Sequence, residues 1–366
     1  MADRRMGGAG APGPVKGRGA GSNASGRFER LIYESFDDGW APDPAAPDEP
    51  RPKTLIHRDQ SRSVLTFNTS PDIGFDRSVN PYRGCEHGCI YCFARPTHAY
   101  LGLSPGLDFE TRIFAKPDAP ALLADALAAP GYRCQPIALG TNTDPYQPIE
   151  RTLAITRGII TVLADANHPL TITTKSANVV RDIDLLAPMA AKGLAAVAVS
   201  VTTLDPALHR TLEPRAPGPM LRLDAVRQLA AAGIPVAVMA APMIPALNDR
   251  ELESILEAAA AAGAGSAAYT LLRLPLEVAP LFEDWLRTHA PLRARHVLSL
   301  IRGARDGKIN DATFGRRMVG SGAYAALLAK RFALAAKRLG LDRRRRPLDV
   351  TRFTPPQPAR GQMRLL

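Results

Sequence analysis

Short apolar runs alternate with amphipathic stretches through the middle of the chain, from about residue 75 to residue 290. An apolar run bounded by Gly, Pro or polar residues is typical of a buried strand, and apolar residues at helical spacing predict a helix. The predicted strands are Phe75–Tyr82, Pro136–Gly140, Leu170–Thr174, Ala195–Val201, Val236–Ala240 and Ala267–Leu272. The predicted helices are Ala119–Leu127, Ile149–Ala164, Ala177–Ala191, Met220–Ala232, Arg250–Ala262 and Leu281–Arg287.

Each of the six predicted strands is followed by a predicted helix. This order indicates an α/β fold with a parallel sheet and short connections. The pattern alone does not distinguish an open, doubly wound sheet from a partial barrel. In parallel barrels the functional residues lie at the carboxyl ends of the strands. The residues that end each strand are therefore the candidate site.

Both ends of the chain differ in composition from the middle. Residues 1–27 are rich in Gly, Ala and Ser, and residues 41–53 are rich in Pro and charge. Neither stretch has enough apolar residues to offset the entropy of the chain. We predict a disordered tail and linker over residues 1–53, a core domain over residues 54–300 and a basic, helical extension over residues 301–366.

The formal net charge of +11 comes from the C-terminal extension. Residues 301–366 contain 16 Lys and Arg against 4 Asp and Glu, whereas the rest of the chain contains 30 against 31. The Gly- and Arg-rich residues 302–323 predict loops with exposed guanidinium groups, and Tyr324–Leu339 predicts a helix. This excess favours an acidic partner such as DNA or RNA. A solvated, Arg-rich surface explains it equally well.

Targeting signals are missing from the pattern of the sequence. No apolar run is long enough to span a membrane, and the N-terminus lacks the apolar stretch of a secretion signal. The low cysteine content fits a reducing compartment. We expect a soluble, cytoplasmic protein with no membrane partner.

Three of the four cysteines lie close together, as Cys85, Cys89 and Cys92 in a C-x3-C-x2-C spacing. Thiolates are soft ligands that suit iron–sulfur clusters, and three of them can hold three corners of a cubane. The fourth iron is then open to a small molecule. The alternative is a structural zinc site with His87 as a further ligand.

The spacing C-x3-C-x-aromatic-C, with Tyr91 before the third cysteine, resembles the cluster motif of the radical S-adenosylmethionine (SAM) superfamily. The longer run from Asn80 to Cys89, Asn-Pro-Tyr-Arg-Gly-Cys-Glu-His-Gly-Cys, resembles the DNA-repair-photolyase-like branch, relatives of spore photoproduct lyase. The resemblance covers roughly residues 54–355. It implies a partial (β/α)6 barrel, a [4Fe–4S] cluster on the three cysteines and SAM on the open iron.

The resemblance also implies a reaction. In that superfamily a reduced cluster cleaves SAM to methionine and a 5′-deoxyadenosyl radical, which abstracts hydrogen from a substrate. We therefore expect a radical SAM enzyme, a lyase or an enzyme of related radical chemistry, with a reductant such as flavodoxin or ferredoxin. The photolyase-like branch favours nucleic acid as substrate. The alternatives are a radical SAM enzyme acting on a protein or small molecule, and a non-catalytic metal- or nucleic-acid-binding module.

SAM contacts are implied first at the end of the second strand. The turn there contains Gly140, Thr141, Asn142 and Asp144, in which the glycine permits close approach and the others supply polar groups. A polar turn that opens a helix would look the same. Tyr91, beside the cluster cysteines, belongs to the same predicted pocket.

Further SAM contacts are implied after the third and fourth strands. Lys175 and Ser200 match a Lys and a Ser that bind SAM in spore photoproduct lyases. Arg215 is a candidate for the SAM carboxylate, because a guanidinium group matches carboxylate geometry. A salt bridge of Arg215 with Glu213 or Asp205 is the alternative.

One departure from the family pattern concerns the hydrogen donor. Spore photoproduct lyases carry a cysteine at the end of the second strand, which returns a hydrogen atom to the product radical. This chain has Gly140 there, and its remaining cysteine, Cys134, precedes the strand. Cys134 is expected to be a small apolar filler. The sequence therefore identifies no catalytic residue and disfavours the spore-photoproduct reaction itself.

Overall fold

A computed structural model describes residues 15–29, 52–343 and 346–356 of the chain. Its main sheet has the strand order β10-β9-β8-β7-β6-β3-β2, in which all strands but β2 are parallel. β2 (Leu65–Phe67) is antiparallel to β3 at the edge. The parallel strands, which confirm the predicted α/β fold, are β3 (Arg77–Val79), β6 (Ile137–Leu139), β7 (Leu170–Thr174), β8 (Ala195–Ser200), β9 (Val236–Met243) and β10 (Ser266–Leu271).

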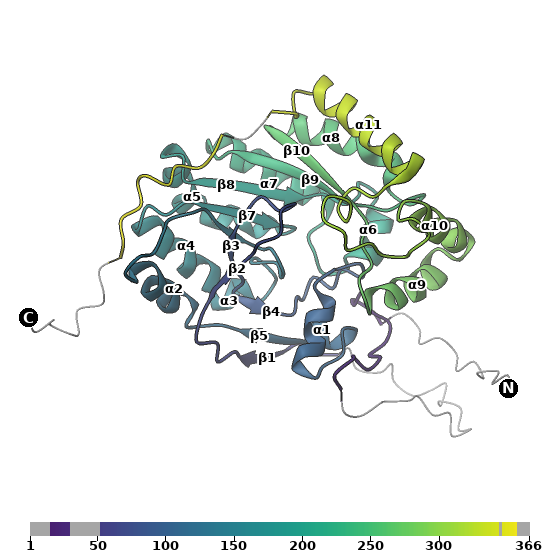
Figure 1. Cartoon of the computed structure of the whole chain (residues 1–366), viewed down its shortest axis with the longest axis horizontal. Helices are drawn as coiled ribbons and strands as arrows, with labels where there is room; N and C mark the ends of the chain where they lie inside the picture. Colours follow the sequence, from purple (N-terminus) through teal and green to yellow (C-terminus); the bar gives the residue numbers. More distant parts are fainter. Residues whose placement is uncertain (1–14, 30–51, 344–345, 357–366) are drawn as a thin grey trace, which may run out of the picture.

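Helices cover the outer face of this sheet (Figure 1). The main ones are α2 (Ala119–Ala128), α4 (Ile155–Asp165), α5 (Ile183–Ala191), α7 (Pro219–Ala231), α8 (Leu252–Ala261) and α9 (Val278–His289). Their apolar residues, except those of α9, meet the strands in one core, where Ile160, Leu186 and Val226 are fully buried. The apolar residues of α9 belong to a second cluster. β8 is buried along its whole length, as expected for a parallel strand covered on both faces. No helix in the described parts of the chain is long and apolar enough to cross a membrane.

The remaining elements are short or lie beyond the sheet. The helical ones are η1 (Arg95–Leu101), α1 (Leu107–Thr111), α3 (Glu150–Leu153), η2 (Ala177–Asp182), α6 (Pro206–Leu212), η3 (Asp249–Glu251), α10 (Pro291–Gly303) and α11 (Gly322–Arg338). A second, small sheet has the order β1 (Leu55–Arg58), β5 (Arg112–Ala115) and β4 (Tyr82–Arg83). The sequence pattern does not reveal this sheet, because strands so short carry too little periodicity.

Three predicted helices are divided in the structure. The one expected over Arg250–Ala262 begins as the 3-10 helix η3 and continues as α8. The helix expected over Ile149–Ala164 is α3 followed by α4, because Ala154 between them has a left-handed backbone with φ of 51°. The helix expected over Ala177–Ala191 begins as the 3-10 helix η2 and continues as α5. The apolar periodicity of the sequence continues through these breaks, so the sequence pattern cannot show where a helix is divided.

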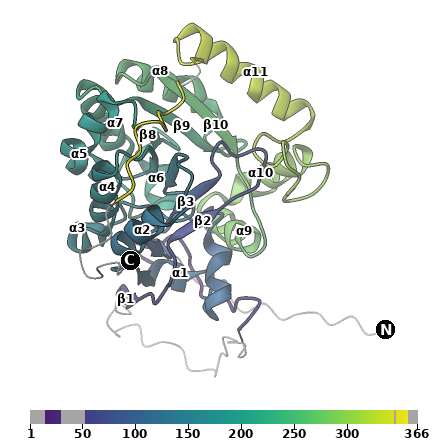
Figure 2. The same cartoon turned by 60° about the vertical axis from the view of Figure 1, so that its left-hand side comes forward.

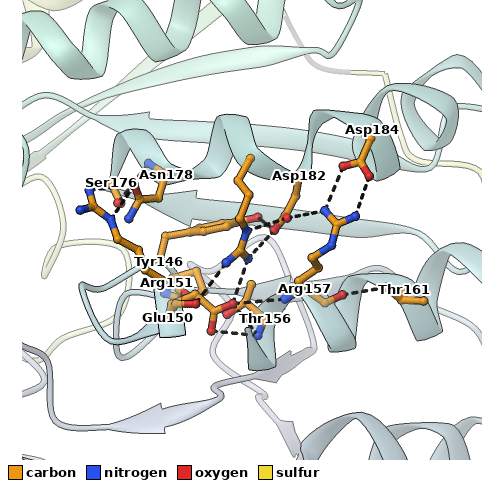
Figure 3. Close-up of polar contacts among 12 residues, drawn as sticks. Tyr146, Glu150, Arg151, Thr156, Arg157, Thr161, Ser176, Asn178, Asp182 and Asp184 are labelled. Atoms are coloured by element: carbon orange, nitrogen blue, oxygen red, sulfur yellow. Dashed lines mark hydrogen bonds and ion pairs between the residues drawn. The ribbon is translucent and has the colours of Figure 1, made fainter. Parts of the chain in front are cut away.

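A buried polar network joins α3 and α4 to η2 and α5 (Figure 3). Glu150, which is fully buried, forms an ion pair of 2.9 Å with Arg181, and Tyr146 donates a hydrogen bond of 3.0 Å to Asp182. Arg157 reaches Asp182 from α4 at 2.8 Å. Each buried carboxylate in this network therefore has a cationic partner, which offsets the cost of removing it from water. The network fixes the turn that follows β6.

The N-terminal segment, residues 15–29, is packed against the body of the protein. The backbone amides of Gly19 and Ala20 donate hydrogen bonds of 3.0 and 2.9 Å to the carboxylate of Glu110, and Ala20 is fully buried. A side chain on Gly19 would collide with the carbonyl oxygen of Gly88. These residues differ from the disordered tail that composition predicts, because backbone amides rather than apolar side chains anchor them. The rest of that prediction lies outside the described residues.

Glu110 also forms an ion pair with Arg95, at 2.5 Å, and both side chains are fully buried. The same guanidinium group donates hydrogen bonds to the carbonyl oxygens of Cys89 at 2.9 Å and Gly88 at 3.1 Å, and to those of Pro105 and Gly106. Arg95 therefore links the cysteine-rich loop to Glu110 and, through it, to the N-terminal segment.

The C-terminal part of the chain packs on the barrel in two places. Helix α11, which matches the predicted helix Tyr324–Leu339, lies over α8 and β10 (Figures 1 and 2). Beyond it, the amides of Asp349 and Thr354 donate to the carbonyls of Gly193 and Ala166, in loops that precede strands. This last stretch therefore covers the amino-terminal end of the barrel. Helix α10 runs across residue 300, where a domain boundary is expected.

Several arginines of the C-terminal extension are paired rather than free. Arg305 is 1% exposed and donates to the carbonyl oxygen of Leu272 at 2.5 Å, and Arg317 forms an ion pair of 2.5 Å with Asp72. The expectation of exposed guanidinium groups is therefore wrong for these two residues. Asp72 follows β2 and Arg317 follows α10, so their ion pair joins segments next to the two edges of the main sheet.

The first prediction concerns the Arg95–Glu110 ion pair. Replacing Arg95 by Met would leave the carboxylate of Glu110 buried without its cationic partner. We expect the free energy of unfolding to fall by about 3–5 kcal/mol, measured by urea denaturation of the metal-free protein without oxygen.

The matched control is Arg58→Met, because Arg58 forms an ion pair with Asp118 in which the side chains are 66% and 56% exposed. Exposed pairs contribute only about 0–1 kcal/mol. Equal, small losses in the two variants would show that the buried pair does not stabilise the fold as we argue.

Candidate functional site

The cysteine loop, residues 84–94, joins β4 to η1 and contains little regular structure. Cys85 and Cys89 are each 7% exposed, and Cys92 is half-buried. All three line one pocket of about 1010 Å³, a volume that includes space open to solvent. The structure thus brings the three predicted cluster ligands to a common pocket at the carboxyl ends of the strands.

Side chains from the turn after β6 hold this loop. The fully buried Gln147 donates from Nε2 to the carbonyl oxygen of Gly84 at 3.2 Å and accepts from the amide of Glu86 at 2.9 Å. The carboxylate of Glu86 in turn accepts from the amide of Ile149 at 2.8 Å. These bonds replace the ladder that a strand or helix would supply, since buried backbone groups need partners. The sequence analysis did not identify Gln147 or Glu86.

The carboxylate of Asp144, a predicted SAM contact, bonds mainly to other residues of the protein. It accepts from Thr174 Oγ1 at 2.6 Å and from the amide of Lys175 at 2.7 Å, and His87 Nδ1 lies 3.4 Å away. Burial acts to raise the pKa of Asp144, but His87 and these hydrogen bonds lower it to about 2. Asp144 therefore remains a carboxylate that ties the cysteine loop to β7, although it also lines the pocket.

Gly140, Thr141 and Asn142 also line the pocket. Gly140 has φ of 79°, and a Cβ there would lie 2.0 Å from the carbonyl oxygen of Thr173. Only glycine therefore allows the turn to approach β7 so closely. Asn80 donates to Thr141 Oγ1 at 3.2 Å and accepts from the Asn142 amide at 3.0 Å, which fixes this part of the turn.

Lys175 and Ser200 meet across neighbouring strands. Lys175 Nζ donates to Ser200 Oγ at 2.8 Å, and Ser200 Oγ donates to the carbonyl oxygen of Ala241 at 3.0 Å. The ammonium group lies 5.7 Å from the centre of the Tyr91 ring, within the range of a cation–π contact. Lys175, Ser200 and Tyr91 all line the pocket, as predicted.

Glu213 lies beneath these three residues and is fully buried. Its carboxylate accepts hydrogen bonds from the Tyr91 hydroxyl and Thr202, forms an ion pair with the buried Arg222, and lies 3.8 Å from Lys175 Nζ. Burial acts to raise the pKa of Glu213, but Arg222 and Lys175 hold it below its ordinary value. A fixed negative charge therefore positions the lysine ammonium and the tyrosine ring.

Sequence reasoning considered Glu213 only as a partner for Arg215. Its true partner, Arg222, lies within helix α7, where a basic residue is usually solvent-exposed. In the sequence, the one indication that Arg222 is buried is its position among apolar residues of that helix, and this signal is weak.

Arg215, a predicted ligand of the SAM carboxylate, does not line the pocket. Its guanidinium group forms an ion pair of 3.1 Å with Glu86 and lies 3.4 Å from Thr54 Oγ1. The expected partners Glu213 and Asp205 are therefore replaced by Glu86. Arg215 supports the cysteine loop from behind, and the geometry gives it no contact with a ligand in the pocket.

The three thiols fit a cluster better than a single metal ion. Among the described residues, no three His, Cys, Asp or Glu side chains are arranged to hold one ion, and His87 is directed to Asp144. This arrangement does not support the zinc alternative. Burial raises the pKa of Cys85 and Cys89, so their thiolates need a nearby positive charge. The irons of a cubane supply that charge at three separate corners.

Cys134 lies in the loop before β6 and does not line the pocket. It is half-buried, and burial raises its pKa to about 11, so its thiol is protonated at neutral pH. Cys134 therefore lies before β6 and Gly140 directly after it, at the opposite end of the same strand.

Comparison with protein families and curated proteins gives consistent matches. Residues 79–259 match the model of the radical SAM superfamily. An uncharacterized protein of Mycobacterium tuberculosis is 43% identical over 225 residues, covering 61% of this chain and 66% of that protein. One from Methanocaldococcus jannaschii is 28% identical over 173 residues, covering 47% of this chain and 62% of that protein. The matched regions thus span slightly less than two thirds of these relatives' own length.

Among solved structures, the fold is similar to that of spore photoproduct lyase. The complex with dinucleoside spore photoproduct has a TM-score of 0.53 at 16% identity, over 78% of each chain. A structure with bound AdoMet and the same dinucleoside has a TM-score of 0.53 at 15% identity, also over 78% of each chain. At such identity the similarity shows the fold, a TIM-like partial barrel. The match over residues 79–259 identifies a radical SAM domain, from a superfamily whose members use a [4Fe–4S] cluster and SAM.

Proposed function

We propose that Cys85, Cys89 and Cys92 hold a [4Fe–4S] cluster and that the adjoining pocket binds SAM. The observation that carries this proposal is that the three thiols and the hydrogen-bonded pair Lys175–Ser200 line the same pocket. When bound, the cluster and SAM would supply a 5′-deoxyadenosyl radical for hydrogen abstraction, after reduction by a protein such as flavodoxin or ferredoxin.

Several residues of this pocket would bind or orient SAM. Lys175 supplies a positive charge for the SAM carboxylate, and Ser200 supplies a hydroxyl group at 2.8 Å from that charge. Glu213 keeps the ammonium group in place from below. The remaining proposed contacts, which share the wall formed by the cysteine loop and the turn after β6, are Tyr91, Gly140, Thr141 and Asn142. Asp144 acts through the backbone of Lys175 and through His87.

Nucleic acid is the substrate class that we propose. Spore photoproduct lyase, whose fold is similar, has been solved with a dinucleoside lesion, and residues 301–366 of this chain carry a net positive charge. Gly140 stands where spore photoproduct lyases carry a cysteine, so hydrogen return in the proposed photolyase-like lyase would differ from theirs.

A protein or small-molecule substrate is the second candidate. The observation in its favour is the pairing of arginines in the extension, where Arg317, Arg331 and Arg338 bind carboxylates of the barrel. Paired arginines offer less charge to a phosphate backbone. Release of 5′-deoxyadenosine in the presence of single-stranded DNA, duplex DNA, RNA or peptides would separate the two candidates.

The second prediction concerns the cluster. Protein reconstituted without oxygen should bind about four irons per chain, as a single cubane requires. Replacing Cys85, Cys89 or Cys92 with Ala should each reduce the iron content strongly. Cys134→Ala is the matched control, because this thiol lies outside the pocket and should leave iron content unchanged. Equal iron in all four variants would exclude the assignment.

The third prediction concerns SAM binding. Lys175→Ala and Ser200→Ala should weaken SAM binding by about tenfold to a hundredfold, since charge-assisted hydrogen bonds contribute about 1.5–3 kcal/mol. Equilibrium dialysis with reconstituted protein measures this loss. Lys192→Ala is the control, because the side chain of Lys192 is exposed and its ammonium group donates to Asn167 Oδ1, outside the pocket. Wild-type affinity in the two pocket variants would mean that SAM binds elsewhere.

A further inference from the structure

Arg273 lies on the wall of the pocket opposite the proposed SAM contacts. It follows β10, the last strand of the sheet, whereas Asn142, Lys175 and Ser200 follow β6, β7 and β8. Arg273 lines the same pocket as the three cysteines. A guanidinium group is therefore available to the pocket from the side at which the sheet ends.

The guanidinium group of Arg273 has no acidic partner among the described residues. Its Nε atom is buried without a hydrogen bond, and its Nη1 contacts only the sulfur of Met318, at 3.6 Å. Sulfur is a weak acceptor. Arg273 is half-buried, and a charged group with a buried donor atom left unpaired is costly, so this group is ready for an anion that the described chain does not supply.

The surroundings of Arg273 increase this demand for an anion. Burial lowers the pKa of Arg273, and the nearby charge of Arg317 lowers it further, while Asp72 acts in the opposite direction. Both oxygens of Asp72 are bound by Arg317. Arg305 donates only to backbone carbonyl oxygens. Three guanidinium groups therefore face two carboxylates, Asp72 and, at Arg305, Asp311, which leaves an excess of positive charge.

Aromatic rings accompany two of these arginines. Arg273 lies over the ring of Phe93 at 5.7 Å from its centre, and Arg317 lies over Phe314 at 4.8 Å. Phe93 directly follows a cluster cysteine, is 49% exposed and lines the pocket, while Phe314 is 54% exposed. Exposed aromatic rings next to basic groups are the means by which proteins bind single-stranded nucleic acid, with bases stacked and phosphates paired.

We propose that Arg273, supported by the ring of Phe93, binds a phosphate group of a nucleic-acid substrate at the mouth of the pocket. This inference rests on the proposed function, since it names the substrate class of the same site. An oxyanion at Arg273 has two possible sources, a substrate phosphate and the SAM carboxylate. Its position after β10, across the pocket from Lys175, favours the substrate phosphate.

The experiment compares Arg273→Met with wild type in two binding measurements on reconstituted protein. A fluorescent single-stranded DNA oligonucleotide is titrated across a salt series, and SAM is titrated separately. We expect oligonucleotide affinity to fall about tenfold, as for loss of a charge-assisted hydrogen bond. The slope of log affinity against log salt should become shallower by about 0.7, the value for one phosphate of a single strand. SAM affinity should not change.

Two further variants make the comparison specific. Arg295→Met removes one exposed arginine of α10, which does not line the pocket, and should change both measurements little. Arg273→Lys retains the charge but not the planar fork, so it should keep the salt slope and lose part of the affinity. Iron content and circular dichroism report whether each variant is folded. If Arg273→Met does not fold, Arg273→Lys takes its place in the comparison.

Three results would overturn the proposal. Arg273 variants that bind the oligonucleotide like Arg295→Met would show that no phosphate binds there. A loss of SAM affinity alone would assign Arg273 to the SAM carboxylate. Wild-type protein that binds SAM and releases 5′-deoxyadenosine without binding nucleic acid would exclude this substrate class while leaving the radical chemistry intact. Failure to release 5′-deoxyadenosine would instead count against the proposed function, independently of the oligonucleotide titration.

Discussion

The structure depends on one constraint, which is that the backbone of the cysteine loop must be satisfied without a helix or a strand. Buried amide and carbonyl groups need hydrogen-bond partners, and the loop has to leave its three thiols directed to a pocket. Arg95 binds the carbonyls of Gly88 and Cys89, while Gln147 binds Gly84 and Glu86. Each of these side chains is fully buried. The loop therefore depends on buried side chains just outside it, from η1 and from the turn after β6, and Glu110 connects Arg95 to the N-terminal segment.

A second layer of buried charge positions the ligand side of the pocket. Glu213 lies between Arg222 and Lys175, and the same carboxylate binds the hydroxyl of Tyr91. A buried carboxylate with a guanidinium partner remains ionised, and its remaining charge attracts the ammonium group of Lys175. The lysine is thus held beside Ser200 before any ligand arrives, which reduces the entropy lost on binding. The pocket combines a rigid cationic side with a loop of thiols, and both are fixed from outside the pocket.

Much of this arrangement follows from the sequence, and the reasons for the exceptions are physical. β7 has the predicted bounds because its apolar residues alternate cleanly between two turn signals. The shared pocket of Cys85, Lys175 and Ser200 follows from parallel topology, which brings strand ends together. Arg215 was misplaced because charge complementarity identifies possible partners but not the one within reach, which is Glu86. The packing of residues 15–29 was not predicted because Gly19 and Ala20 are anchored through their backbone amides. Every residue except proline has such an amide, so amino-acid composition does not show this anchoring.

The barrel is open between its two edge strands. The sheet ends at β10 on one edge and at β2 on the other, and the pair Asp72–Arg317 joins the segments that follow these edges. The paired arginines of the extension are thus structural, and they hold the backbone that carries Arg273. Because Arg305 binds the carbonyl oxygen of Leu272, the residue before Arg273, a change in this extension would move the unpaired guanidinium group. The basic extension, whose charge suggested a nucleic-acid surface, would then act on the substrate indirectly, by setting the position of one arginine at the pocket.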